Sequence, residues 1–402
     1  MIRHGSLFGQ ILGVFNRNIF TRLVMKHGSD KHSKGFTSWD QFTSMLFCQL
    51  AQAKSLREIN QGLSSCVGKL KHLGMRQAPK RSTLSYANKH RTWTLYEDLF
   101  YNTLGECRKM MIPGKKKFRF KNKLLSLDSS TISLCLSLFP WAEYRQKKGA
   151  IKLHLLLDHD GYLPAYAYIS NGKKHDSTIA KHVPLSKGSI VAMDRAYNNY
   201  KLFSEWVNQG IFFVTRLKKN AVYEVLSSNP VPKHRNIISD EIIRFSADAA
   251  KRNCPHDFRK VTVWVPEKNK EIVLLTNHLT FGATTISAIY KDRWQIELFF
   301  KALKQNLRVK TFVGTSENAL LIQIWTALIA ILLVKYLQFK SKLNWSLSNL
   351  VALLRWNLFV YKDLWDWIDK PFETKNRIPP DMQMSLPFTG IGQHLWKREP
   401  NY

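Results

Sequence analysis

Three acidic residues lie in apolar surroundings, where a carboxylate needs a specific partner. Asp128 stands within the run LLSLDSSTI, Asp194 within SIVAMDRAY, and Glu297 within IYKDRWQIELFFKALKQNL. Because burial of an isolated carboxylate costs a large free energy, each acid should bind a cation or a hydrogen-bond donor. A strand-end position for Asp128 and a turn or helix cap for Asp194 would explain each of them separately.

The third of these runs, Ile289 to Leu307, predicts a helix with its charges along the edge of an apolar stripe. Each residue advances about 100° around a helix, so one arc of roughly 80° collects a phenol, an acid and three cations. These residues are Tyr290, Arg293, Glu297, Lys301 and Lys304. Ion pairs four positions apart stabilise many exposed helices, so a solvated face is the simple explanation of this arc alone. Beside the arc, Trp294 is expected to pack in the core rather than to stack on a nucleic acid base.

Taken together, the three acids predict a metal site for phosphodiester chemistry. They fall on two predicted strands and one predicted helix, in a chain that is otherwise strongly cationic. Mg²⁺ takes hard oxygen ligands and retains several waters, so a few carboxylates suffice to bind it. Two such ions about 3.5–4 Å apart can stabilise the attacking and the leaving oxygen of a phosphodiester. No triad of Ser or Cys with His and no Walker-type glycine-rich loop is visible in the sequence.

The net charge points to a polyanionic partner. The chain has 402 residues, enough for two or three domains, and its 45% hydrophobic content is that of a folded protein. It carries 61 Lys and Arg residues against 29 Asp and Glu, a formal net charge of +32. A chain this basic repels itself, so nucleic acid is the first candidate partner and an anionic membrane surface is the second.

The membrane alternative has little support in the sequence. The most apolar run, Ala319 to Val334, is shorter than the roughly 20 residues of a spanning helix and contains Gln323 and Thr326, so a buried core helix is expected. The N-terminus lacks the apolar stretch and cleavage site of a secretory signal. Scattered cysteines without CxxC spacing argue against a disulfide framework or a zinc site. We therefore expect a cytoplasmic protein without a membrane partner.

Residues 1–112 read as a helical domain. A Ser-x-x-Glu capping box at Ser55 and Glu58 predicts one helix start, and a long helical pattern with a Ser or Thr cap begins near Arg81. Two helices around a glycine-containing connection, with Lys and Arg nearby, suit a small DNA-binding module. An ordinary helical bundle fits the same pattern equally well. The basic stretch from Pro113 to Lys123 marks the boundary of this domain.

The remaining chain predicts an α/β core. In residues 113–219, short apolar runs bounded by Gly, Pro, Asp and Lys read as three strands, a helix, a strand, a helix and a strand. Residues 220–280 are β-rich, with an alternating pattern in RKVTVWVPE. Residues 281–402 turn helical again and include Glu297. This order predicts a mixed sheet with a β-rich insertion before the helix that carries Glu297.

These motifs carry a resemblance to a known family. The runs LDSSTI and MDRAY, together with the spacing Tyr290-x2-Arg293-x3-Glu297-x6-Lys304, resemble the cut-and-paste bacterial transposases of the insertion-sequence-four family. The Tyr-Arg-Glu-Lys helix of that family has this spacing, and the four-residue pattern is quite specific. The runs KGAIKLHLLLD, SLREI and STLSYANKHR resemble one subgroup, so the likeness covers nearly the whole chain.

The resemblance implies an RNase H-like catalytic core whose DDE metal triad is Asp128, Asp194 and Glu297, with a helical DNA-binding domain before it and C-terminal helices after it. It implies a two-metal site for Mg²⁺, with Mn²⁺ as a substitute, and double-stranded DNA as partner, both as element ends and as target. The residues implied to contact transposon-end DNA are Tyr290, Arg293, Lys301 and Lys304. A homodimer in the DNA complex and a cytoplasmic, nucleoid-associated location complete the expectation.

The predicted function is that of a DNA transposase, which excises an insertion sequence in a metal-dependent reaction and joins its 3′-OH ends to target DNA. Two alternatives stay open. A metal-dependent DNA nuclease would use the same RNase H-like core without strand transfer. A catalytically inactive DNA-binding protein would share the charge, but the presence of all three acids counts against it.

Overall fold

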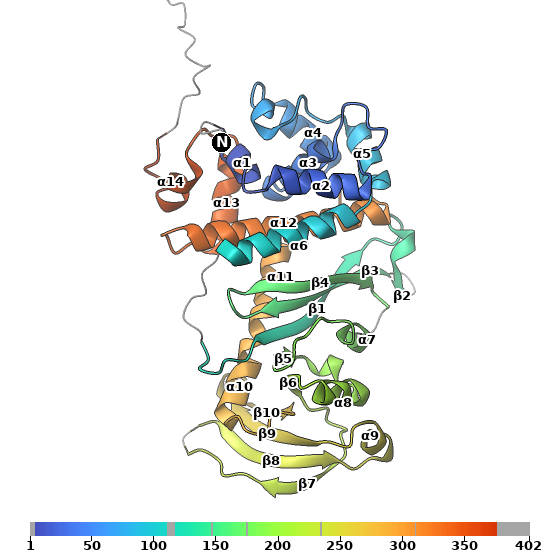
Figure 1. Ribbon diagram of the computed structural model, residues 1–402, viewed down its shortest axis with the longest axis vertical. Coiled ribbons are helices and arrows are strands. Elements are labelled where there is room, and N and C mark those ends of the chain that lie inside the picture. Colours follow the sequence, from blue (N-terminus) through green and yellow to red (C-terminus); the bar gives the residue numbers. More distant parts are fainter. Residues whose placement is uncertain are drawn as a thin grey trace, which may run out of the picture.

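One large sheet dominates the structure. The computed structural model describes residues 5–110, 117–145, 148–173, 176–233, 235–309 and 311–375. Within them, ten strands form a single mixed sheet, with a helical body beyond one end of it (Figure 1). The predicted mixed α/β class is therefore confirmed. Part of the predicted basic boundary, residues 113–116, lies outside the described residues.

Five strands build the half of the sheet that carries Asp128 and Asp194. Their order is β4-β3-β1-β5-β6. Strand β3 lies antiparallel between β1 and β4, whereas β5 and β6 run parallel to β1. The bounds are β1 Leu124–Leu134, β3 Lys148–Asp158, β4 Leu163–Asn171, β5 Ile190–Met193 and β6 Phe212–Arg216, and a short β2, Glu143–Arg145, pairs with β3. Helices α7 (Asp176–Ala180) and α8 (Tyr200–Asn208) lie in the connections between parallel strands.

Side chains of β1 and β5 alternate between two cores. Leu127 and Met193 pack with the apolar side of α8. Leu124, Ile190 and Ala192 pack instead with α10, which spans Ala283–Asp292. Farther along β1, Ile132 and Leu134 pack in the core of the helical body. Because successive side chains on a strand point to opposite faces, Asp128 and Asp194 lie on the same face of the sheet as Leu124, Ile190 and Ala192.

The predicted β-rich segment at residues 220–280 extends the same sheet. Its elements are β7 Tyr223–Ser228, β8 Ile237–Phe245, α9 Asp248–Asn253, β9 Asp257–Val265 and β10 Lys270–Thr276. Strand β10 pairs antiparallel with β6, and the order continues β10-β9-β8-β7. In β9, Val261 and Val263 are buried whereas Trp264 is 36% exposed, as the alternating pattern predicts. Thr262 departs from the pattern, because it is buried as well.

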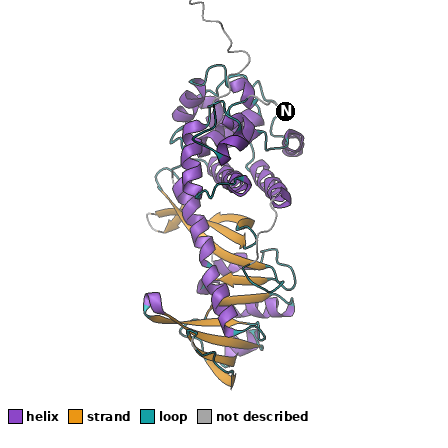
Figure 2. Cartoon of the chain, turned by 90° about the vertical axis from the view of Figure 1, so that its left-hand side faces the viewer, coloured by secondary structure: helices purple, strands orange, loops and turns teal. Residues whose placement is uncertain are grey.

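The prediction of one continuous helix from Ile289 to Leu307 is wrong, because the segment forms two helices. Helix α10 ends at Asp292, and α11 runs from Trp294 to Asn306. Arg293 joins them with φ −51° and ψ −29°, so the backbone stays right-handed and the two helices follow one another across one face of the strands (Figure 2). The break coincides with two consecutive buried charges that bind different partners in the sheet. Trp294 is 51% exposed, so the prediction that it packs in the core is also wrong.

Helices from both ends of the chain build the helical body (Figure 1). Their bounds are α1 Leu7–Leu12, α2 Arg17–His27, α3 Ser38–Leu50, α4 Leu56–Ser64, α5 Arg81–His90, α6 Thr94–Met110, α12 Glu317–Lys340, α13 Leu347–Asn357 and α14 Leu364–Asp369. Helix α12 is long and apolar enough to cross a membrane, but 94% of its most apolar window is buried inside the protein. It is the core helix that the sequence predicts, and α3, α5 and α6 pack on it.

The N-terminal and C-terminal helices share one hydrophobic core. The rings of Phe100 on α6 and Trp325 on α12 lie 5.3 Å apart between their centroids. The backbone N–H of Leu7 donates to the carbonyl of Val360 at 3.0 Å. The predicted domain boundaries stay predictions, but the helices on either side of the sheet segment pack as one unit.

Candidate active site

The register of two parallel strands brings Asp128 and Asp194 together. Strands β1 and β5 are hydrogen-bonded neighbours, and Leu127 pairs with Met193 at the last position of their ladder. Asp128 and Asp194 are the next residues on each strand, so they meet at the carboxyl end of the paired segment. Asp194 also begins the short 3-10 turn Arg195–Tyr197, where its carboxylate accepts from the N–H of Ala196 at 3.0 Å.

Arg293 connects the first and third acids. Its guanidinium donates to Asp128 Oδ2 at 3.0 Å and to Glu297 Oε1 at 2.5 Å. The Arg293 side chain is only 10% exposed, because it lies at the α10–α11 junction between the helices and β1. The Cζ atom of Arg293 lies 5.6 Å from the ring centroid of Tyr290. The arrangement thus holds Glu297, on the first turn of α11, next to the strand that carries Asp128.

Burial and mutual repulsion perturb the acids. Burial, together with repulsion from Glu297 and Asp194, raises the pKa of Asp128 to about 6, against the opposing effect of Arg293. Burial works to lower the pKa of Arg293, but Asp128, Tyr290 and Glu297 outweigh it and raise that pKa above its usual value. Burial raises the pKa of the Tyr290 phenol. Perturbed groups that share a site are typical of catalytic centres, although structural ion pairs show them too.

The two lysines of the predicted motif lie farther along α11. Lys304 Nζ donates to the carbonyl of Thr131 on β1 at 2.9 Å, three residues beyond Asp128. Lys301 is exposed. The structure therefore gathers Tyr290, Arg293 and the three acids around the middle of β1 and the end of β5, with both lysines on the helix that leads away from them. The roles of these seven residues stay predictions.

The donor set suits Mg²⁺, but Arg293 occupies part of it. Asp128, Asp194 and Glu297 offer the hard carboxylate oxygens that Mg²⁺ prefers. Within the described part of the chain, no three His, Cys, Asp or Glu side chains are close enough to bind one metal ion as they stand. The reason is local, because the Arg293 guanidinium lies between Asp128 and Glu297 and binds both. Arg293 thus takes up one oxygen of Asp128 and one oxygen of Glu297.

The family of the chain follows from the sequence that runs from just before β1 into α12. Residues 119–333, more than half of the chain, match the family model described as the transposase DDE domain. The chain belongs to this DDE transposase family. Residues 3–76 match a second model, described as domain of unknown function 4372. The predicted kinship with DDE transposases is thus confirmed, whereas the Tyr-Arg-Glu-Lys motif stays a prediction.

Known relatives carry transposase names. The chain is 28% identical, over 66% of its own length and 70% of the relative's, to the probable transposase of an insertion sequence element of Geobacillus stearothermophilus. It is 26% identical to a protein of Sinorhizobium fredii named as a transposase, over 71% of this chain and 80% of that protein. A solved synaptic complex of the piggyBac transposase with hairpin DNA matches with a TM-score of 0.43 and 13% identity, covering 88% of this chain and 79% of that chain.

A cationic rim beside Asp194 was missed by the sequence reasoning. A cavity of about 470 Å³ is lined by Asp194, Arg195, Ala196, Lys218, Lys219 and Asn220. Its lysines follow β6, the parallel neighbour of β5, so they reach the same edge of the sheet as the second acid. Paired lysines at the end of the predicted strand run Ile211 to Lys219 were the available signal. They place positive charge beside Asp194.

The structure contains a buried Ser-His-Asp arrangement, although no such triad is visible in the sequence. Nδ1–H of His159 donates to Asp292 Oδ2 at 2.6 Å, and in the neutral imidazole Nε2 then accepts from the Ser126 hydroxyl at 2.7 Å. The three residues are far apart in the chain and share no motif, so no sequence signal could have joined them. Ser126 is fully buried.

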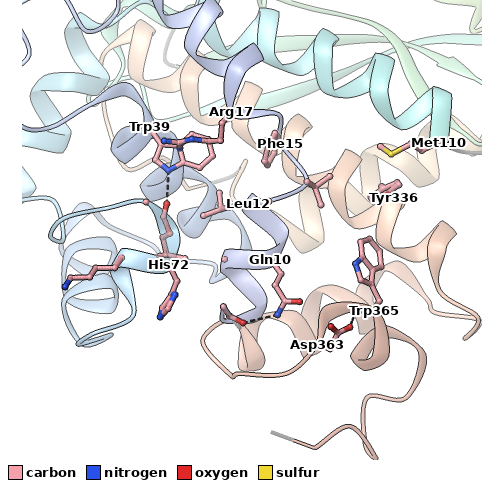
Figure 3. A pocket seen from close by; sticks show the side chains of 17 residues that line it. Gln10, Leu12, Phe15, Arg17, Trp39, His72, Met110, Tyr336, Asp363 and Trp365 are labelled. Atoms are coloured by element: carbon pink, nitrogen blue, oxygen red, sulfur yellow. Dashed lines mark hydrogen bonds between the residues drawn. The ribbon is translucent and has the colours of Figure 1, made fainter. Parts of the chain in front are cut away.

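A cavity of about 900 Å³ lies in the helical body and not at the acids (Figure 3). Several of its polar groups already have partners within the protein. Trp39 Nε1 donates to the carbonyl of Leu73 at 2.8 Å, and the Arg17 guanidinium stacks on the Trp39 ring at 3.5 Å. Asp363, the single acid in its lining, caps α14. This cavity therefore has no set of groups for phosphodiester chemistry.

Proposed function

We propose that this DDE protein is the transposase of an insertion sequence, which excises the element by metal-dependent cut-and-paste cleavage and joins its 3′-OH ends to target DNA. The observation that supports this proposal best is the meeting of Asp128 and Asp194 where the paired segment of two parallel strands ends, on the face where Arg293 holds Glu297. The transposase names of the relatives support the same function.

An RNase H-like core is part of the proposal. Three antiparallel strands, β4-β3-β1, continue into the parallel strands β5 and β6, with helices on both faces. This order supports such a core, in which the first acid lies on the central strand and the second ends the neighbouring parallel strand. The β-rich insertion then separates the second acid from α11, as the resemblance implies.

The chain's own residues would prepare the reaction. Asp128, Asp194 and Glu297 would hold Mg²⁺ or Mn²⁺, whose charge stabilises the attacking and leaving oxygens of a phosphodiester. Arg293, once it has released one acid, has a guanidinium free to bind a DNA phosphate beside the acids. Because the Asp128 pKa is about 6, its carboxylate is ionised at neutral pH and available as a ligand. Lys301 and Lys304 would extend phosphate contacts along α11.

Recognition of the element ends is assigned to the N-terminal helices. Between Lys54 and His90 the chain carries eight Lys and Arg residues and a single acid, Glu58. Helix α5 contains no acid and exposes Arg81, Ser82, Ser85, Tyr86, Lys89 and His90. Such side chains can donate to phosphates and to base edges in a major groove. A homodimer in the DNA complex and a cytoplasmic, nucleoid-associated location remain part of the proposal.

Labelled element ends with Mg²⁺ test the proposal. Full-length protein should cut the ends and give end–target products with a new covalent joint. Asp128→Ala, Asp194→Ala or Glu297→Ala should each abolish cleavage while end binding persists, and a double variant should be little worse than a single one. Asp248→Ala, at an exposed acid on α9, is the matched control. Cleavage without any joined product, with paired ends bound, would replace the transposase by the nuclease.

A further inference from the structure

We propose that Ser126, His159 and Asp292 form a positioning relay that fixes the α10–α11 junction against β1, so that Arg293 and Glu297 face Asp128. The proposal rests on the proposed function, because it explains how the acids of that site are held. The three relay residues are positioning residues, which act on the acids through the backbone and through Arg293. None of them belongs to the predicted metal triad.

One end of the relay is anchored on β1. Ser126 lies two positions before Asp128 and points to the same face of the sheet. Its hydroxyl hydrogen-bonds to Nε2 of His159 at 2.7 Å. His159 directly follows β3, and its own backbone N–H donates to the carbonyl of Leu124 at 3.1 Å. The imidazole is thus carried by a residue that is itself tied to β1.

The other end of the relay is the last residue of α10. Nδ1 of His159 bonds to Asp292 Oδ2 at 2.6 Å, and the Asp292 side chain is 2% exposed. Lys117 Nζ donates to Oδ1 and the Tyr162 hydroxyl donates to Oδ2 of the same carboxylate. Burial opposes ionisation of Asp292, but His159 and Lys117 outweigh it and lower its pKa, so the carboxylate stays charged.

Two anchors on one strand fix the rotation of the junction. Asp292 is tied to Ser126 through His159, and the next residue, Arg293, is tied directly to Asp128. The two β1 residues are two positions apart, which is roughly 7 Å along a strand. A junction held at a single point could turn about that point, whereas two points this far apart define its orientation. Glu297, one turn further along α11, is therefore held in a fixed orientation toward β1.

The same geometry rules out a serine nucleophile. Ser126 is fully buried, with a relative solvent accessibility of 0%, so no substrate carbonyl or phosphate reaches its hydroxyl. Both oxygens of Asp292 are already bound, which leaves this acid without a free position for a metal ion. The hydrogen bonds of Ser126, His159 and Asp292 are therefore all made within the protein, and they hold these groups in place.

Ser126→Ala, Asp292→Asn and their combination test the relay. End binding without metal, Mg²⁺-dependent cleavage, thermal unfolding and Mn²⁺ affinity from the electron paramagnetic resonance of the free ion are measured on the full-length chain. Groups that orient metal ligands typically cost 10–100-fold in metal affinity or activity when they are removed. We expect a loss of about that size in cleavage and Mn²⁺ affinity, with end binding and the unfolding temperature near those of the wild type. The double variant should be no worse than the worse single variant, because both changes break one chain of contacts.

Asp160→Asn is the matched control, since this exposed carboxylate lies next to His159 and should change nothing. Full cleavage and Mn²⁺ affinity in either single variant, additive losses in the double variant, or an equal loss in Asp160→Asn would each overturn the relay. If Asp292→Asn does not fold, Ser126→Ala breaks the relay with the loss of one hydroxyl. If wild-type protein binds ends but never cleaves them, the proposed function fails. Hydrogen exchange over residues 289–297 then decides the relay, which requires faster exchange there in Ser126→Ala and unchanged exchange elsewhere.

Discussion

Asp128 should lower the stability of the folded protein at neutral and higher pH, where its carboxylate is ionised. Its pKa is raised from 3.8 to about 6 in the folded chain, and its side chain is 18% exposed. A difference of about two pKa units corresponds to about 3 kcal/mol between the two protonation states. Since the folded pKa lies above the unfolded one, the folded state binds the proton more tightly, and this contribution to stability is lost as pH rises through about 6.

The variant Asp128→Asn removes the ionisation and keeps the shape of the side chain. Its free energy of unfolding should exceed that of the wild type by about 3 kcal/mol at pH 8, where the wild-type carboxylate is charged in both states. At pH 4.5 the folded carboxyl is protonated, and the same linkage leaves a difference of about 1 kcal/mol. Cleavage should be lost in the variant at every pH.

Urea unfolding in the presence of a metal chelator measures both differences. Asp160→Asn, at an exposed carboxylate, should shift the free energy of unfolding by less than about 0.5 kcal/mol at either pH. Equal or lower stability of Asp128→Asn at pH 8 would show that the contact with Arg293 outweighs burial. A gain that does not shrink between pH 8 and pH 4.5 would show that ionisation is not its cause. Either result would refute the reasoning.

Three further predictions follow from the same contacts. Arg293→Ala removes the cation that lowers the Asp128 pKa, so the acidic limb of the cleavage pH profile should move above about pH 6, whereas Arg22→Ala on α2 should leave it unchanged. Binding to duplex DNA should weaken steeply between about 50 and 200 mM salt, and an affinity that ignores salt would contradict a phosphate-dominated interface. Deletion of residues 1–112 should cost solubility and helical content, measured by gel filtration and circular dichroism, because α12 loses the helices that cover it; a folded, monodisperse fragment would contradict the shared core.

Local patterns in the sequence predicted local structure well. Ser55 caps α4 as expected, since its Oγ accepts from the N–H of Glu58 at 3.1 Å. The Glu58 carboxylate accepts from the N–H of Lys54 at 2.9 Å, so the reciprocal half of the capping box is displaced by one residue. The core helix, the strand RKVTVWVPE in the insertion and the order of strands and helices were also predicted, because each depends on neighbours within a few residues.

Predictions failed where a distant contact overrides the local pattern. The long helical pattern from Arg81 is broken between α5 and α6, and its N-cap is Lys80 without a side-chain cap. Arg91, in the break, has an extended backbone, and its carbonyl accepts from Nδ2 of Asn318 on α12. The break at Arg293 has the same kind of cause, since its partner Asp128 is 165 residues away. Neither partner can be identified from periodicity.

The candidate site depends on strand register in a way that residue types do not reveal. Leu127 and Met193 define the pairing that carries Asp128 and Asp194 to one face and one edge of the sheet. A slip of one residue in β1 would turn Asp128 toward α8 and away from Arg293, because side chains on a strand alternate between faces. The apolar residues on both faces of β1 and β5 oppose such a slip, since it would exchange them between two packed cores. The packing of apolar residues on both faces of β1 and β5 therefore fixes the register that brings Asp128 and Asp194 together. The sequence identifies the acids, but it does not show this packing.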